Sequence, residues 1–342
     1  MAAPLPIAYF DGRFQPIGEV RISPLDRGFL FADAVYEVLP AYGGRPFRFV
    51  EHCDRLDRSC REIRMAPPHT RAEWAGILTE LVRRNGGGDM YLYVHVTRGA
   101  ENDRNHAIPA GLRPTVFAMA MPLPPLTAET RAHGVAAITT PDLRWKRCDI
   151  KSTSLLGNVL AKTLAADAGA TEAILLADGW LREGSSTSVI VVRDGALHAP
   201  PEGPEILPGT TRALVYELAA RVGIPAHVAP VPEAALRSAD EILRAAGDAA
   251  RRRGRRQRPA GPGVDEAPRR VPRLRRGARR PTAALIPAPP CTAAGAPPSC
   301  GDGHRLHQHA ARVPGRPPGQ GDGPRLAGVP RARAAGGRAA RR

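Results

Sequence analysis

The chain has 342 residues and a formal net charge of +16 at pH 7, but this charge is concentrated at one end. Residues 245–342 contain 22 Arg, no Lys and five acidic residues, a net charge of +17, so residues 1–244 together carry −1. Every Trp, Tyr and Phe lies before residue 245. The first 244 residues are therefore a near-neutral globular sequence, and the basic charge of the whole chain says nothing about what they bind.

Cysteine usage and hydropathy exclude other classes of protein. The five cysteines show no zinc-type spacing and are odd in number, so we expect reduced thiols and no metal site. The start of the chain lacks the charged and apolar segments of a signal peptide, and no run of eighteen apolar residues occurs. These features predict a soluble, cytoplasmic protein.

The pattern of residues 1–120 predicts a small α+β domain. Asp11-Gly12 suits a type I′ turn and indicates a hairpin over 7–14. Apolar residues at helical spacing predict an amphipathic helix over 50–63. Alternation predicts three further strands, over 35–42, 91–97 and 115–121. A Pro-rich stretch marks residues 121–127 as a linker.

Residues 128–244 predict a second domain that mixes strands and helices. Asp178-Gly179 and Asp194-Gly195 indicate hairpin turns, and Thr210 is the expected N-cap of a helix that ends near Arg221. The other expected elements are strands over 134–139, 172–177, 224–231 and 240–243, and helices over 156–167 and 232–237.

Two short runs in this second domain indicate chemistry. Lys151 lies in Arg147-Cys-Asp-Ile-Lys-Ser-Thr-Ser-Leu-Leu-Gly157, a polar segment ahead of a helix, and Glu183 opens Glu-Gly-Ser-Ser186 further along. Taken singly, they are explained as a surface lysine and a turn carboxylate. Together they supply what pyridoxal 5′-phosphate (PLP) needs: an amine for a Schiff base and a carboxylate that keeps the pyridine nitrogen protonated.

Further short runs follow one another in a fixed order along the chain. They are Ser23-Pro-Leu-Asp-Arg-Gly-Phe-Leu-Phe31, Val35-Tyr-Glu37, Glu51-His-Cys-Asp-Arg-Leu56, Thr97-Arg-Gly99, Arg104-Asn-His106 and Leu207-Pro-Gly-Thr-Thr-Arg212. Each is weak alone, but their order and spacing closely resemble those of the class IV (fold type IV) aminotransferases, in particular the D-amino-acid aminotransferases. The resemblance covers nearly all of the patterned chain, from residue 7 to residue 243.

This resemblance implies both a fold and an activity. The fold is α/β (α+β), with a small N-terminal α/β sandwich and a larger pseudo-barrel domain that binds the cofactor. The activity is PLP-dependent transamination of a D-amino acid, such as D-alanine, with 2-oxoglutarate to give pyruvate and D-glutamate. The resemblance also implies a homodimer whose partners are an amino acid and a 2-oxo acid, without a membrane or a specific nucleic acid.

The resemblance assigns roles to the cofactor-binding residues. Lys151 forms the Schiff base and moves a proton between substrate Cα and cofactor C4′, and Glu183 pairs with the pyridine nitrogen. The remaining cofactor contacts are Arg55, Thr210 and Thr211 on the phosphate and Leu207 on the pyridine ring. Without the resemblance, Arg55 would be a solvated helix-face charge and Thr210 a simple helix cap.

A second set of residues would bind the substrate. Tyr36, Arg104 and His106 match the residues that hold the α-carboxylate in D-amino-acid aminotransferases, with the Arg104/His106 pair contributed by the partner subunit. Unaided, this pair would be a solvated loop. Branched-chain aminotransferases and aminodeoxychorismate lyases are the alternatives, because they share Lys151 and Glu183 but do not need the pair.

Two features depart from the family pattern. The usual Phe-Gly-Asp-Gly-Val-Tyr-Glu is Phe31-Ala-Asp-Ala-Val-Tyr-Glu37 here, so Ala32 and Ala34 replace glycines. If either glycine needs a positive φ, the alanine costs about 1 kcal/mol and could shift Tyr36. The family also continues after Glu241 with a strand, a Ser/Thr phosphate-binding turn, an Asp-Gly hairpin and a helix, none of which is readable here.

The segment 245–342 has an unusual composition, since Arg, Ala, Pro and Gly make up 73 of its 98 residues. It predicts a disordered tail. We interpret it as GC-rich coding sequence read out of frame, because one codon choice for Arg252-Arg-Gly-Arg-Arg256 spells Val-Ala-Val-Asp-Gly one base later. Such a C-terminus would leave the second domain incomplete and impair activity. The alternative is a basic nucleic-acid-binding arm, but aromatic residues do not interleave the charges.

Overall fold

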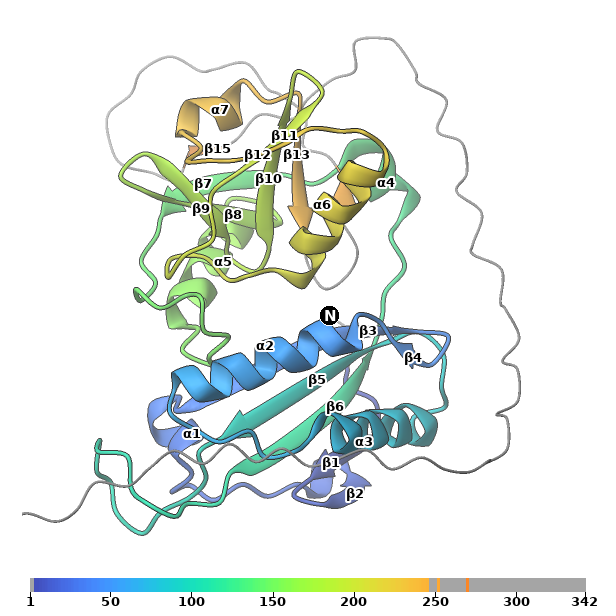
Figure 1. Cartoon of the computed structure of the whole chain (residues 1–342), viewed down its shortest axis with the longest axis vertical. Helices are drawn as coiled ribbons and strands as arrows, with labels where there is room; N and C mark the ends of the chain where they lie inside the picture. The colour runs from blue at the N-terminus through green and yellow to red at the C-terminus, as the bar shows by residue number, and fades with distance from the viewer. Residues whose placement is uncertain (1–2, 246–250, 253–268, 271–342) are drawn as a thin grey trace, which may run out of the picture. The chain divides into compact units, whose positions relative to one another are not determined.

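The computed structural model describes residues 3–245, 251–252 and 269–270. Its N-terminal part is built on an antiparallel six-stranded sheet with the order β2-β1-β6-β5-β3-β4 (Figure 1). The strands are β1 (Ile7–Phe10), β2 (Arg13–Pro16), β3 (Ala34–Tyr42), β4 (Arg45–Pro46), β5 (Met90–Thr97) and β6 (Thr115–Pro122). β3 and β5 pair continuously, so their side chains hold fixed positions on the two faces.

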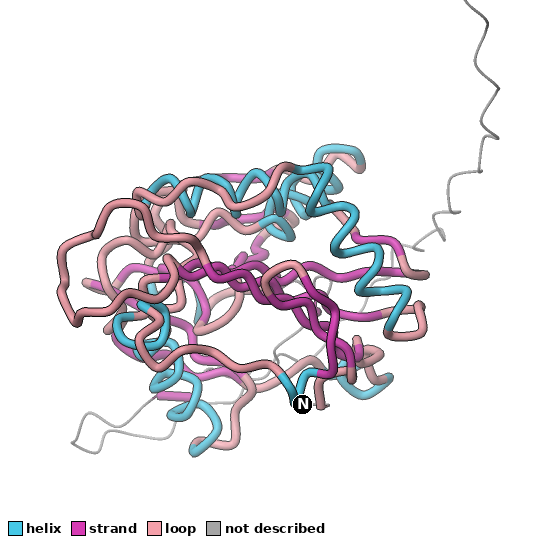
Figure 2. Tube along the Cα trace, turned by 90° about the horizontal axis from the view of Figure 1, so that it is seen from below, coloured by secondary structure: helices cyan, strands magenta, loops and turns pink. Residues whose placement is uncertain are grey.

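Two helices pack on one face of this sheet, α2 (Phe49–Glu62) and α3 (Arg71–Arg84), seen from below in Figure 2. A short helix, α1 (Arg27–Phe31), and a 3₁₀ turn, η1 (Ile17–Glu19), precede them. The sequence analysis did not predict α3. Its signal is a capping box, in which the Thr70 side chain accepts from Glu73 N–H and the Glu73 carboxylate accepts from Thr70 N–H. Trp74, 1% exposed, anchors the helix in the core.

The opposite face of the six-stranded sheet is only partly covered. Tyr36 on β3, Tyr93 and His95 on β5, and Phe117 on β6 alternate with the core residues and are half-buried. This face therefore carries aromatic and polar side chains that the hydrophobic core does not need.

The second part contains two sheets, joined by contacts between β9 and β10. One has the order β12-β11-β10-β13-β14 and the other β15-β7-β8-β9. The strands are β7 (Ala137–Pro141), β8 (Glu172–Ala177), β9 (Trp180–Gly184), β10 (Ser188–Arg193), β11 (Ala196–Ala199), β12 (Ala226–Val228), β13 (Glu241–Ala245), β14 (Arg251–Arg252) and β15 (Arg269–Arg270). The helices are α4 (Ala128–His133), α5 (Leu156–Asp167), α6 (Thr210–Arg221) and α7 (Glu233–Arg237). The α/β fold class expected from the sequence is therefore confirmed, while the predicted domain bounds stay a prediction.

Most predicted elements of the second part are present. The helix over 156–167 and the strand over 172–177 have the predicted bounds. Asp178 and Asp194 have φ of 53°, each followed by a positive-φ glycine, as the Asp-Gly turns require. The predicted cap of α6 is wrong. Gly209 is the N-cap, and the Thr210 hydroxyl is hydrogen-bonded to His52 of α2 instead, because Thr210 already lies in the first helical turn.

Five residues of the basic tail lie within the described part. Ala245 ends β13, Arg251–Arg252 pairs with β13 and Arg269–Arg270 pairs with β7, so the expectation of a tail without regular structure does not hold for these residues. The rest of the predicted disordered tail lies outside the described residues.

Two other expectations concern cysteines and membranes. Cys53, Cys60 and Cys148 are buried free thiols, and burial raises their pKa to about 12, 12 and 11. Within the described ranges, no helix is long and apolar enough to cross a membrane.

The two alanines that replace family glycines differ in backbone conformation. Ala32 ends α1 in the left-handed region, with φ 54° and ψ 29°. Ala34 begins β3, where it is 1% exposed and its N–H donates to Ala32 O at 2.8 Å. Only Ala32 therefore carries the strain expected from the sequence.

We expect Ala32→Gly to stabilise the protein by about 1 kcal/mol, because glycine adopts this conformation without a Cβ clash. The matched control, Ala34→Gly, should destabilise it by about 0.5–1 kcal/mol, since glycine weakens a strand interior. Urea denaturation of both variants measures the two free energies of unfolding. Destabilisation by Ala32→Gly would show that the strain is absent.

Candidate active site

Lys151 is held against the edge of β3 by its own backbone. Its N–H donates to Ser59 Oγ at 3.2 Å, and its carbonyl accepts from Tyr36 N–H at 2.9 Å. Ser152 forms an isolated antiparallel bridge with Val35, so the loop pairs with the start of β3. The Lys151 Nζ lies 4.3 Å from the centre of the Tyr36 ring. The structure thus brings together the predicted lysine and tyrosine, with the amine over an aromatic face.

Glu183 lies at the end of β9 and is 6% exposed. Its Oε1 accepts from the Arg144 guanidinium and from Leu207 N–H at 3.3 Å. Burial raises the pKa of Glu183 above its ordinary value, against the opposing effects of Arg144, Leu207 and Lys151. Both described bonds fall on Oε1, which leaves Oε2 for another cation. The predicted residues Glu183, Leu207 and Lys151 therefore belong to one site.

Arg144 is a site residue that sequence analysis missed. Its side chain is 5% exposed and forks onto Asp142, with Nε–Oδ1 at 2.9 Å and Nη2–Oδ2 at 2.8 Å. Burial acts to lower the pKa of Arg144, but Asp142 and Glu183 raise it above the ordinary value. Gly157 packs closely against the backbone of Arg144. A Cβ at residue 157 would lie 3.2 Å from Arg144 Cα, which is tighter than ordinary contact. Its only signal in the sequence is the spacing Asp142-x-Arg144.

A buried carboxylate, Glu37, holds Arg55 in place. Arg55 donates from Nε to Oε1 at 2.7 Å and from Nη2 to Oε2 at 2.9 Å, and its Nη1 donates to Pro208 O at 2.9 Å. His52 Nδ1 lies 2.8 Å from Glu37 Oε2, and its Nε2 lies 3.2 Å from Thr210 Oγ1. Burial acts to raise the pKa of Glu37, but Arg55 and His52 lower it to about 2. The carboxylate is thus ionised.

The same contacts build an anion site at the start of α6. The bonds of Arg55 use three of the five guanidinium N–H groups, so two remain for an anion. Thr210 and Thr211 open α6, where the helix dipole favours negative charge. Gly209 precedes them, and a Cβ there would lie 2.6 Å from Ser188 Oγ. The predicted phosphate ligands therefore converge on one place.

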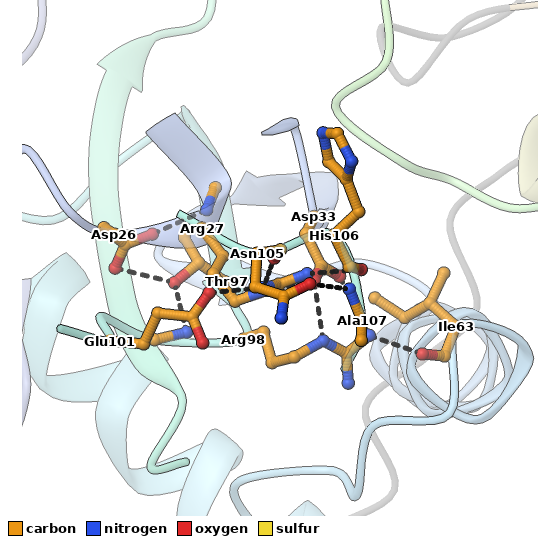
Figure 3. A network of polar contacts seen from close by, with 12 residues as sticks. Asp26, Arg27, Asp33, Ile63, Thr97, Arg98, Glu101, Asn105, His106 and Ala107 are labelled. Carbon is orange, nitrogen blue, oxygen red and sulfur yellow. Dashed lines mark hydrogen bonds and ion pairs between the residues drawn. The ribbon is translucent and has the colours of Figure 1, made fainter. Parts of the chain in front are cut away.

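Arg104 and His106 lie elsewhere, in an exposed loop after β5. Arg27 and Arg98 both donate hydrogen bonds to the Asp33 carboxylate (Figure 3). Arg27 also donates to the backbone carbonyls of Asn105 and His106, which lie in this loop. The His106 ring points away from this network and lies 5.2 Å from the Phe31 ring centre. The Arg104 guanidinium carbon is 5.3 Å from the same ring. Among the contacts of the described residues, the side chains of this pair meet Phe31, and none joins them to Tyr36 or Lys151.

The chain is similar to known proteins over the part that carries these residues. A family model described as amino-transferase class IV matches residues 34–246. The D-alanine aminotransferase of Bacillus licheniformis is 40% identical over 234 residues, which cover 68% of this chain and 82% of the relative. That of Listeria monocytogenes serotype 1/2a is 40% identical over 220 residues, 64% of this chain and 76% of the relative.

Solved structures show the same architecture. A branched-chain amino acid aminotransferase from Escherichia coli has a TM-score of 0.68 at 23% identity, covering 72% of this chain and 85% of that chain. A branched-chain aminotransferase from the archaeon Thermoproteus uzoniensis, solved with norvaline, has a TM-score of 0.65 at 27% identity, covering 73% and 86%. A third branched-chain enzyme, complexed with N-(5′-phosphopyridoxyl)-L-glutamate, has a TM-score of 0.66 at 27% identity, covering 72% and 84%.

The residues gathered here fit the PLP predicted from the sequence. The Glu183 carboxylate has one oxygen left for a pyridinium. Lys151 is close enough to Glu183 to oppose, in part, the rise of its pKa on burial. Arg55 and the first turn of α6 supply cationic and N–H donors for a phosphate. A lysine, a carboxylate and an anion site therefore occur in the combination that this cofactor needs.

Arg144→Gln should weaken PLP binding at neutral pH. Without Arg144 the pKa of Glu183 rises further, so more of the carboxylate is protonated and cannot pair with the pyridinium. Each unit by which the pKa of Glu183 comes to exceed the working pH costs about 1.4 kcal/mol of pyridinium binding, or about tenfold in affinity. Titration of the apoprotein with PLP measures this, and the loss should shrink as pH rises.

The matched control is Arg182→Gln. Arg182 precedes Glu183 but pairs with Glu205 at 2.9 Å, so PLP affinity should stay within about twofold. Equal losses in the two variants would contradict the role of Arg144.

Proposed function

Because this chain belongs to the class IV aminotransferases, which are PLP-dependent enzymes, we propose that it transaminates a D-amino acid such as D-alanine with 2-oxoglutarate, giving pyruvate and D-glutamate. The observation that carries the choice of a D-amino acid is the occurrence of both the Arg104-x-His106 pair and the Val35-Tyr-Glu37 run in the sequence of a chain 40% identical to D-alanine aminotransferases. A fixed anchor for the α-carboxylate decides which face of Cα is presented to Lys151.

The residues of this chain would divide the work. When bound, PLP supplies the electron sink for the electrons released at substrate Cα. Lys151 Nζ would take the proton from Cα and return it on the cofactor side, with the Tyr36 ring limiting where the amine can move. Glu183 would hold the proton on the ring nitrogen through Oε2, because Arg144 and Leu207 occupy Oε1.

The anchoring residues act at the other end of the cofactor. Arg55, Thr210 and Thr211 would bind the phosphate, and Leu207 would pack on the pyridine ring. The supporting observation is the chain of contacts from Glu37 through His52 to Thr210, which fixes α2 and the start of α6 together. This would hold the cofactor rigidly while Lys151 moves.

We also propose that the enzyme works as a cytoplasmic homodimer, with Arg104 and His106 reaching the site of the partner subunit. One face of α5 is apolar and exposed: Leu156 is 72%, Val159 55% and Leu160 52% exposed. These residues recur at helical spacing, which is typical of a face that another chain covers. Phe29, 74% exposed, adds apolar surface on α1, near the Arg104 loop.

The second candidate is a branched-chain aminotransferase. It is favoured by the solved structures with matching architecture, two of which are branched-chain enzymes at 27% identity. Aminodeoxychorismate lyase shares the same cofactor residues. Neither alternative requires the Arg104/His106 pair.

Assays of D-alanine, L-leucine and aminodeoxychorismate side by side should show a clear preference for D-alanine. The full chain loaded with PLP is used, and the 2-oxo acid formed in each assay is measured. With 2-oxoglutarate as acceptor, this is pyruvate from D-alanine and 4-methyl-2-oxopentanoate from L-leucine; from aminodeoxychorismate it is the pyruvate released without an acceptor. Arg104→Ala should raise KM for D-alanine by at least about tenfold, because a charge-assisted carboxylate contact is lost. Preference for L-leucine, or lyase activity, would overturn the choice of substrate while leaving the family assignment intact.

Reduction with borohydride should fix the pyridoxyl group to Lys151. Peptide mapping identifies the labelled lysine, and Lys146 and Lys162 are internal controls on either side. Lys151→Ala should abolish turnover but retain PLP through Arg55 and Glu183 without a covalent link. A label on either control lysine would refute the assignment.

We further propose that the coding sequence changes frame near codon 244. The match to the family model ends at residue 246, where the near-neutral composition also ends. The test is the DNA around this codon, translated in all three frames. Another frame should encode a strand, a Ser/Thr turn and an Asp-Gly hairpin, and the restored chain should be near-neutral with higher PLP occupancy. No such segment in any frame would refute the proposal.

A further inference from the structure

One ring nitrogen of His95 is buried without a hydrogen-bond partner among the described residues. This residue lies on β5, and the nitrogen is Nε2. Most buried polar groups in folded proteins are hydrogen-bonded, so an exception calls for a ligand or a water. The hydrophobic core lies on the opposite face of the sheet, so packing does not explain a histidine here.

The neighbours of His95 define which hydrogen it carries. Tyr93 Oη lies 3.3 Å from His95 Nδ1. Burial raises the pKa of Tyr93 to about 12, so the phenol keeps its proton and can donate it to Nδ1. Burial also lowers the pKa of His95, against a smaller effect of Asp26. In the tautomer in which the Tyr93 O–H donates to Nδ1, the neutral imidazole carries its proton on Nε2, and we take this tautomer, with Nε2–H as the unused donor.

Two tyrosine rings connect this donor to the Lys151 amine. His95 is directly opposite Tyr36 in the β3–β5 register, on the same face of the sheet. The Tyr36 ring lies 4.3 Å from Lys151 Nζ and 5.8 Å from the Tyr93 ring centre. Tyr93 in turn contacts His95 and Phe117, with ring centres at 5.9 and 6.4 Å. An aromatic wall therefore runs from the lysine amine to the imidazole.

We propose that His95 binds the side-chain carboxylate of the dicarboxylic substrate, D-glutamate or 2-oxoglutarate. The proposal rests on the proposed transaminase function and extends it. The α-carboxylate goes to Arg104 and His106, and the second carboxylate, at the far end of a flexible chain, accepts from His95 Nε2–H along the aromatic wall. A substrate without a second carboxylate, such as D-alanine or pyruvate, leaves this donor unused. His95 thus distinguishes the two members of the substrate pair.

Binding of unreactive analogues tests this without turnover. The full chain loaded with PLP is titrated calorimetrically with glutarate, which carries two carboxylates, and with butyrate, which carries one. Wild type should bind glutarate about 10–100-fold more tightly, as expected for a hydrogen bond to a charged group. His95→Phe should abolish this preference, and His95→Gln, which keeps a donor, should retain most of it. His198→Phe, far along the chain on β11, should leave it unchanged.

Kinetics provide a second readout. His95→Phe should raise KM for 2-oxoglutarate about 10–100-fold while KM for pyruvate stays within about twofold. Equal binding of glutarate and butyrate by wild type would overturn the assignment of His95, whether or not the variant folds. So would an unchanged preference in His95→Phe. Absence of any D-alanine turnover in wild type would instead refute the proposed function, so the two failures are distinguishable.

Discussion

The site depends on one buried ion pair, Glu37 with Arg55. Removing two charges from water is costly, and the pair is tolerated because Arg55 makes two bonds to the carboxylate and His52 adds a third. The same two partners reach α6, Arg55 through Pro208 O and His52 through Thr210. Loss of Glu37 would leave a buried guanidinium uncompensated, at a cost of about 3–5 kcal/mol, and would release the anion site from the sheet.

The pKa values of two buried carboxylates of this enzyme, Glu37 and Glu183, are shifted in opposite directions. Arg55 and His52 together bond to both oxygens of the Glu37 carboxylate, and its pKa falls to about 2. Glu183 has Arg144 and one N–H on a single oxygen, and burial leaves its pKa above the ordinary value. The difference follows from how many donors each carboxylate has. The donors of Glu37 all come from the protein, whereas Glu183 would be stabilised further by another cation, which the pyridinium of PLP would supply in the proposed function.

Local patterns in the sequence predicted the elements, and motifs predicted the chemistry. The helix over 156–167 follows from its apolar spacing, and Lys151 and Glu183 follow from short runs. Other features were not predictable because they join distant residues. Arg144 and Glu183 are 39 residues apart, Arg55 and Pro208 are 153 apart, and nothing in a linear pattern shows that they meet. The sequence does not show that Ala32 has a positive φ. That angle arises where α1, which Asp26 caps at its N-terminus, ends at Ala32.

The end of the patterned chain also bears on the site. Glu172, fully buried, accepts from the hydroxyls of Ser185 and Thr187, so it supports the turn that follows Glu183. Arg244 Nη1 lies 3.3 Å from its Oε2, and Lys162 Nζ lies 3.9 Å from its Oε1. Arg244 is thus the nearer of two cations that compensate a buried charge. Arg244 precedes the proposed out-of-frame segment, lies within the match to the family model, and is carried to Glu172 by β13. The turn after Glu183 is therefore supported by the last strand of the patterned chain, through one ion pair.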